Sequence, residues 1–279
     1  MKPPRLIHLP DQRVTQTLAS GITIRQDFRT ATRFPFFHTG HDQWQYATHG
    51  GTLFVVLYGG KPYGLTCRHV LQTFDWGQLV VTAERFGGGA AGLSKIAYAS
   101  NPKGYAVDTD ILDLAVIQFS DDVTSSFFTD AAYLIDERTV TTSKVGDALH
   151  VHGALKAPSE IAETIIAPKF CLLELVDNTP LSNDPTLRRA FGMFESPEFA
   201  DVVGLSGSPV FNVTQSALCG IVVRGAMNGD TCTLWYVDMF DVLKLLAAVH
   251  EGKDATFYEK PAILRSSDTA VAKAASEKP

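Results

Sequence analysis

A serine enclosed by glycines is the first feature of this sequence that could do chemistry. Residues 204–210 read Gly-Leu-Ser-Gly-Ser-Pro-Val, so Ser206 lies in a predicted turn that ends at a proline and leads into an apolar strand. A neutral serine hydroxyl is a poor nucleophile at neutral pH. It needs a general base, and the base needs a carboxylate to hold its tautomer and stabilise its cation.

His69 is the candidate base. The sequence predicts a strand over residues 51–58, a turn over 59–62 and a return strand over 63–66, so a hairpin delivers His69 at its end. The alternative is that His69 merely caps a strand end and has no catalytic role.

Asp113 is the candidate acid because it opens the buried run Asp-Leu-Ala-Val-Ile at 113–117. A carboxylate at the start of such a run is costly to bury unless it is paired, and an imidazole would pair it. Asp108 and Asp110 lie just upstream and compete with Asp113 for this role.

The three candidates occur in the order His69, Asp113, Ser206, whereas subtilisin-like enzymes have the order Asp, His, Ser and α/β-hydrolases the order Ser, acid, His. With Thr-Cys-Arg-His-Val at 66–70 and Asp-Leu-Ala-Val at 113–116, the chain resembles the trypsin/chymotrypsin-like serine peptidases over about residues 45 to 250. The HtrA-like and viral-type members are the most similar, although no segment of PDZ size follows. The resemblance favours Asp113 over its two competitors.

The resemblance implies an all-β fold of two six-stranded antiparallel barrels of chymotrypsin-like type with a C-terminal α-helix. The expected organisation is an N-terminal extension (1–44), a first barrel with His69 and Asp113 (45–122), a connector (123–142), a second barrel with Ser206 (143–236), a helix (237–251) and a tail (252–279). Asp238 is the expected helix cap. The glycine-rich stretch at 86–92 is interpreted as a loop, since no Gly-Lys-Ser/Thr follows it.

Two positions of the serine motif depart from the family pattern Gly-Asp-Ser-Gly-Gly-Pro. Leu205 replaces the aspartate that binds a new amino terminus after zymogen cleavage, and the chain has no Ile-Val-Gly-Gly activation sequence. Ser208 replaces a glycine with another small residue. These departures imply an enzyme that does not use the trypsin zymogen switch.

The function implied by the resemblance is that of a serine endopeptidase that works through an acyl-enzyme. Ser206 attacks, His69 shuttles the proton, Asp113 orients His69, and the amides of Gly204 and Ser206 form the oxyanion hole. The expected substrate-binding residues are Ala200, Asp201, Val223, Arg224 and Gly225. Ala200 at the pocket floor favours a small or medium apolar side chain, whereas Asp201 there would favour Lys or Arg.

Composition excludes some partners. With a net charge of −6 and a pI near 5.7, the chain lacks the excess of positive charge that nucleic acid or an anionic membrane would attract. The amino terminus has no secretory signal pattern and no segment approaches a membrane span, so we expect a cytoplasmic protein with reduced cysteines. No cofactor is expected. The partners are a protein or peptide substrate and a regulatory protein, since a cytosolic peptidase must be gated.

Three alternatives remain open. The pairs His150/His152 and His38/His41 could bind a metal, although we expect His150 and His152 to be partly exposed strand residues. An α/β-hydrolase would use Ser206, Asp238 or Asp241, and His250, but its nucleophile needs a helix directly after it, and residues 209–213 are predicted as a strand. A catalytically silent fold that binds peptides or proteins is the second class of function.

Overall fold

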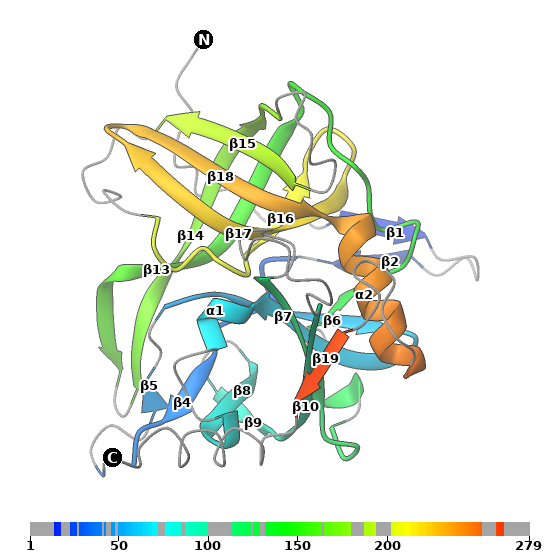
Figure 1. Ribbon diagram of the computed structural model, residues 1–279, viewed down its shortest axis with the longest axis vertical. Coiled ribbons are helices and arrows are strands. Elements are labelled where there is room, and N and C mark those ends of the chain that lie inside the picture. The colour runs from blue at the N-terminus through cyan, green and yellow to red at the C-terminus, as the bar shows by residue number, and fades with distance from the viewer. Residues whose placement is uncertain are drawn as a thin grey trace.

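The computed structural model describes residues 14–17, 23–26, 28–40, 42, 46–47, 50–71, 76–84, 87–99, 113–123, 125–128, 132–162, 165–179, 187–193, 202–252 and 261–264. These residues are mostly β-strands, as the sequence predicts. Figure 1 shows one group of strands in the upper part of the view and another in the lower part, with the helix α2 (Met239–Glu251) at their side. A separate hairpin pairs β1 (Val14–Thr17) with β2 (Thr23–Gln26).

The first sheet carries seven strands, in the order β12-β6-β7-β11-β10-β19 with β3 beside β6. The strands are β3 (Thr32–Arg33), β6 (Leu53–Tyr58), β7 (Lys61–Cys67), β10 (Leu93–Ala99), β11 (Leu114–Phe119), β12 (Tyr133–Leu134) and β19 (Pro261–Leu264). The first four residues of β6 and of β11 are all buried, because both faces of the sheet are covered.

The second sheet contains a closed barrel. Its strands pair in the order β13-β16-β17-β18-β15-β14, and β14 pairs again with β13, which closes a ring of six. They are β13 (Ala148–Ala162), β14 (Ile165–Asp177), β15 (Leu187–Met193), β16 (Pro209–Asn212), β17 (Ala217–Asn228) and β18 (Thr231–Asp238). The described pairings therefore close one of the two barrels that the sequence predicts, and leave β12 and β19 as the ends of the first sheet.

Four strands branch from this barrel, in the order β14-β5-β4-β8-β9. They are β4 (Phe36–His38), β5 (Tyr46–Ala47), β8 (Leu79–Glu84) and β9 (Gly87–Ala91). Residues 87–91 were predicted as a loop and instead form β9, which pairs with β8. The chain between residues 28 and 38 is part of both sheets, since β3 pairs with β6 and β4 pairs with β8.

The helix α2 begins where the sequence predicts. Asp238 caps it by accepting a hydrogen bond from the amide of Phe240 at 3.0 Å, and Gly252 ends it at φ +65°. Its buried face packs in the same apolar core as the first sheet. With 13 residues, α2 is the longest helix in the described part of the chain and falls short of the ~20 residues that a membrane-spanning helix needs.

The closed barrel holds a buried polar network around Asp177. Its carboxylate accepts hydrogen bonds from Ser143, from the Tyr236 hydroxyl at 2.7 Å, and from Arg188 at 3.2 Å. Burial would raise the pKa of Asp177, but the hydrogen bonds from Ser143, Tyr236 and the Thr179 amide outweigh burial and lower it. Asp177 is therefore charged in the folded protein and fully paired.

Candidate active site

His69 and Asp113 meet at the ends of two paired strands. The register of β7 and β11 places Leu114 opposite Cys67, so Asp113 lies beside the one-turn helix α1 (Arg68–Leu71) that carries His69. Asp113 Oδ2 accepts from His69 Nδ1 at 2.5 Å, and Oδ1 accepts from the His69 amide at 3.0 Å. Two hydrogen bonds to one carboxylate fix both the backbone and the ring of His69.

This pair is open to solvent on one side. The side chain of His69 is 48% exposed and that of Asp113 is 27% exposed. The competing acids Asp108 and Asp110 lie outside the described residues. Asp113 is thus placed as the sequence predicts, at the start of a buried strand, and His69 Nε2 faces away from the carboxylate.

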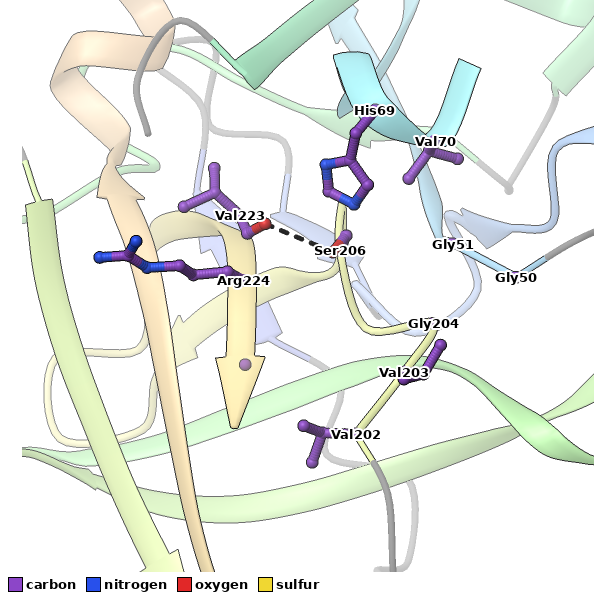
Figure 2. Close-up of a pocket in the computed structure, with 11 residues that line it drawn as sticks. Gly50, Gly51, His69, Val70, Val202, Val203, Gly204, Ser206, Val223 and Arg224 are labelled. Atoms are coloured by element: carbon purple, nitrogen blue, oxygen red, sulfur yellow. Dashed lines mark hydrogen bonds between the residues drawn. The ribbon is translucent and has the colours of Figure 1, made fainter. Parts of the chain in front are cut away.

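Ser206 lies in a tight loop that enters β16. The loop needs glycines, since Gly204 has φ +109° and Gly207 has φ +90°, a region that L side chains rarely adopt. Figure 2 shows the His69 ring pointing toward Ser206. In this conformation Ser206 Oγ donates to the carbonyl of Val223 at 3.3 Å instead of to His69.

The backbone amides of Gly204 and Ser206 are unpaired. Neither donates a hydrogen bond to any group in the described part of the chain, although Gly204 is buried and Ser206 half-buried. Buried amides almost always have a partner, and a neighbouring pair without one is suited to hold a negatively charged oxygen.

A cavity of about 300 Å³ lies at this site (Figure 2). It is lined by Gly50, Gly51, His69, Val70, Val202, Val203, Gly204, Ser206, Val223, Arg224 and Gly225. Six of the nine residues expected at the site line this cavity. Of the other three, Asp113 is hydrogen-bonded to His69, and Ala200 and Asp201 lie outside the described residues.

The sequence analysis missed Val202, whose side chain restricts the cavity. A Cβ at Gly225 would lie 2.9 Å from Val202 Cγ2 and 2.7 Å from Leu234 Cδ2, so these two side chains already fill the space beside Gly225. The position of Val202, just before the Ser206 loop, was the available signal. The sequence does not tell which side chain of that segment points into the cavity.

One edge of β17 runs along the cavity. The described pairing of β16 with β17 extends from Ala217 to Ile221, whereas β18 pairs with β17 as far as Asn228. Val223, Arg224 and Gly225 therefore line the cavity beyond the end of β16. A sheet edge of this kind can pair with an extended peptide.

The pair His150/His152 is buried, contrary to the expectation of partly exposed strand residues. His150 and His152, predicted to be partly exposed, are 7% and 5% exposed. His152 stacks on Phe170 and meets the edge of Phe28, so residues of the N-terminal extension cover this face of β13. His38 accepts from the Gly40 amide, and His41 lies outside the described residues.

The residues of the α/β-hydrolase alternative are engaged elsewhere. Asp238 caps α2, Asp241 pairs with Lys244 at 2.8 Å, and His250 forms a hydrogen bond with the Tyr63 hydroxyl at 2.9 Å. Ser206 is followed by β16 and not by a helix. The structure therefore does not bring these residues to Ser206.

Among the described residues, Cys67, His69 and Asp113 offer metal-ligand atoms within 4.8 Å of one another. The Cys67 thiol is buried and donates to the Val222 carbonyl, and the carboxylate is engaged by His69. All four cysteines of the chain are buried free thiols. The geometry is that of a histidine–carboxylate pair beside a structural thiol.

The fold is similar to that of known structures. The scabies mite inactivated protease paralogue is 13% identical, with a TM-score of 0.52, over 82% of this chain and 98% of that one. Human heparin binding protein is 11% identical, with a TM-score of 0.53, over 82% and 95% of the two chains. No protein family model and no curated protein sequence matches the chain. These likenesses show that the chain has the trypsin/chymotrypsin-like fold.

Proposed function

We propose that this protein is a serine endopeptidase. The observation that carries the proposal is the meeting of three groups at one cavity: the His69–Asp113 pair, Ser206 below the His69 ring, and two unpaired amides in the Ser206 loop. These are the groups that acyl transfer needs, namely a base, a nucleophile and an oxyanion site.

The mechanism follows from which atoms are engaged. Asp113 occupies Nδ1 of His69, so Nε2 is the nitrogen that accepts the proton of Ser206 as Oγ attacks the peptide carbonyl. The amides of Gly204 and Ser206 bind the oxyanion. His69 then protonates the leaving amine, and water releases the acyl group by the same route in reverse.

The substrate is an extended peptide that lies along Val223 to Gly225 as an added strand. Because Val202 and Leu234 fill the space beside Gly225, the side chain before the scissile bond is small and apolar. This preference agrees with the prediction that Ala200 forms the pocket floor and favours apolar side chains. It does not agree with the alternative that Asp201 lies there and favours Lys or Arg.

The apolar surroundings of Leu205 support regulation that does not depend on zymogen cleavage. This residue is 1% exposed and packs in the core of the closed barrel, where a trypsin-type aspartate would bind a new amino terminus. We further propose, from the sequence, that the protein is an HtrA-like or viral-type member, that it acts in the cytoplasm, and that its activity is gated by a protein partner or by rearrangement of the loop before Ser206.

A binding module is the second candidate, favoured by one observation. Ser206 Oγ donates to Val223 and not to His69, and one similar structure is by its name an inactivated protease paralogue. In this case the cleft would hold a peptide strand without cleaving it.

The test is hydrolysis of unfolded casein by the wild type and by Ser206→Ala, with the fold of both checked by circular dichroism. We expect the variant to lose ~10⁴-fold or more of the turnover, and a fluorophosphonate to label the wild type alone. Equal rates in both proteins would contradict Ser206 as the nucleophile. A folded wild type that neither cleaves nor reacts would favour the binding module.

A further inference from the structure

Thr52 links the first sheet to both ends of the segment that carries the oxyanion amides. It precedes β6 and is fully buried. Its amide donates to the carbonyl of Ser206 at 2.7 Å, and its hydroxyl donates to the carbonyl of Gly204 at 3.0 Å. One residue of the opposite half of the molecule therefore holds two carbonyls of the nucleophile loop.

The direction of these hydrogen bonds follows from counting donors and acceptors. The Thr52 hydroxyl oxygen lies 2.9 Å from the amide of Ala154 and 3.1 Å from Ser208 Oγ. An amide can only donate and the Gly204 carbonyl can only accept, so the single hydroxyl proton goes to Gly204, and Ser208 donates to Thr52. Every hydrogen-bonding position of this hydroxyl is used, so it cannot turn away without leaving a buried group unpaired.

The hydrogen bond from Thr52 restrains the Gly204 carbonyl, whose backbone is otherwise free to rotate. Gly204 has no side chain and a positive φ, so its ψ is free over a wide range, and the position of its carbonyl depends on what binds it. The segment from Gly204 to Ser206 carries both unpaired amides. The Gly204 carbonyl belongs to the planar peptide group between Gly204 and Leu205, which lies between the peptide group that carries the Gly204 amide and the one that carries the Ser206 amide. Holding this carbonyl therefore restricts where both amides point.

The backbone and side chains around Thr52 are tightly packed. A Cβ at Gly207 would lie 1.9 Å from the Thr52 carbonyl oxygen, and a Cβ at Gly153 would lie 1.8 Å from Ser208 Oγ. Thr66 donates to the same Thr52 carbonyl at 2.6 Å. The backbone of Thr52 is thus held from its own sheet while it holds the loop.

We propose that Thr52 is a positioning residue whose hydroxyl sets the geometry of the oxyanion hole. The inference rests on the proposed function and deepens it. Thr52 does not touch the substrate, so its loss affects the stabilisation of the transition state and leaves substrate binding along β17 intact.

The experiment compares Thr52→Val, which keeps the shape and removes the hydroxyl, with Thr52→Ser, which keeps the hydroxyl. The matched control is Thr32→Val, because Thr32 is also fully buried and its hydroxyl donates to the Phe28 carbonyl at 3.2 Å, away from the cavity. All are assayed on a small ester substrate for kcat and KM, for the rate of fluorophosphonate labelling, and for stability.

We expect Thr52→Val to lower kcat by roughly 10²-fold with KM within about twofold of the wild type, and to slow labelling similarly. Thr52→Ser should restore most of kcat. Thr32→Val should lose as much stability as Thr52→Val and keep its kcat. The shape of the pH–rate profile should be the same in all variants, since His69 and Asp113 are untouched. If Thr52→Val fails to fold, Thr52→Ala replaces it, with the same loss of kcat expected.

An active wild type with a folded Thr52→Val of equal kcat overturns this inference and leaves the proposed function standing. A Thr52→Ser variant as slow as Thr52→Val, or a loss confined to KM, overturns it as well. A wild type that neither cleaves the ester nor reacts with the fluorophosphonate overturns the proposed function, and the inference fails with it.

Discussion

In the first sheet, His69 and Asp113 are brought together by the pairing of β7 with β11, whereas Ser206 in the closed barrel depends on contacts that reach across to Thr52. The first arrangement is local to one strand pair and is fixed by its register. The second joins residues 152 and more positions apart and exists only when both halves are folded and docked. The His69–Asp113 pair is therefore assembled within its own sheet, whereas the Ser206 loop is assembled between the halves.

The halves also differ in what fills them. The large apolar cluster joins the first sheet and α2 to side chains of β16, β17 and β18, whereas a second cluster inside the closed barrel combines its apolar residues with three buried thiols, and the barrel also holds the Asp177 network. Apolar cores tolerate repacking, but a buried charge network fails when one member is removed. The barrel with Ser206 should be the more sensitive half.

Asp177→Ala is the strongest test of this difference. The change leaves Arg188, Ser143 and Tyr236 without their acceptor, so we expect the free energy of unfolding to fall by about 3 to 5 kcal/mol, measured by urea denaturation. Lys244→Ala removes an exposed partner of a surface pair and serves as the control, with little change expected. An Asp177→Ala protein as stable as the control would mean that the network does not hold the barrel.

Gly207→Ala tests the contact between the halves, with Gly60→Ala as its control. Both glycines have positive φ, +90° and +79°, but a Cβ at Gly60 meets nothing within 4 Å. We expect Gly60→Ala to cost about 1 to 2 kcal/mol of stability from backbone strain alone. Gly207→Ala should cost more, by about 1 to 3 kcal/mol of overpacking against the Thr52 carbonyl, and should also slow labelling of Ser206.

Equal losses of stability in the two glycine variants, with labelling unchanged in both, would show that the approach of Gly207 to Thr52 is unimportant. The stability of the two glycine variants is measured by thermal unfolding followed by circular dichroism, and the rate of Ser206 labelling is measured for each.

His150 gives the smallest expected effect. Burial lowers its pKa from the usual 6.5, and Arg29 lowers it further, although Glu174 at 3.3 Å acts in the opposite direction. The unfolded chain therefore takes up this proton more readily than the folded one, so stability decreases as the pH falls below about 6.5. We expect His150→Gln to flatten stability between pH 7 and pH 5, measured by urea denaturation at each pH. A variant with the wild-type dependence would assign the effect to other groups.

Much of the site could be predicted because its chemistry has a fixed pattern. The resemblance carried by His69, Asp113 and Ser206 predicted that they share one site, and the structure brings His69 and Asp113 into contact with Ser206 near the ring. Their catalytic roles stay a prediction. Asp238 was predictable as a cap for the same reason, since capping is local. Thr52 was not, because a threonine before a strand carries no signal until the fold places Gly204 beside it.

The other differences arise from tertiary packing. The burial of His152 involves Phe28, which lies more than a hundred residues earlier in the chain. Residues 87–91 form a strand because β8 offers them an edge, although glycine runs favour loops. The first sheet is not closed by the described pairings, and strand patterns alone do not reveal closure.

The packing of α2 on the first sheet has a consequence for the order of events during synthesis. The apolar residues of α2, from Met239 to Val249, complete a core whose other members begin at Phe28, so the half that carries His69 lacks part of its interior until the ribosome has passed α2. His69 is encoded early in the chain but becomes rigid late. Under the proposed function, a nascent chain would therefore emerge without a working cleft and would not cleave itself or its neighbours in the polysome.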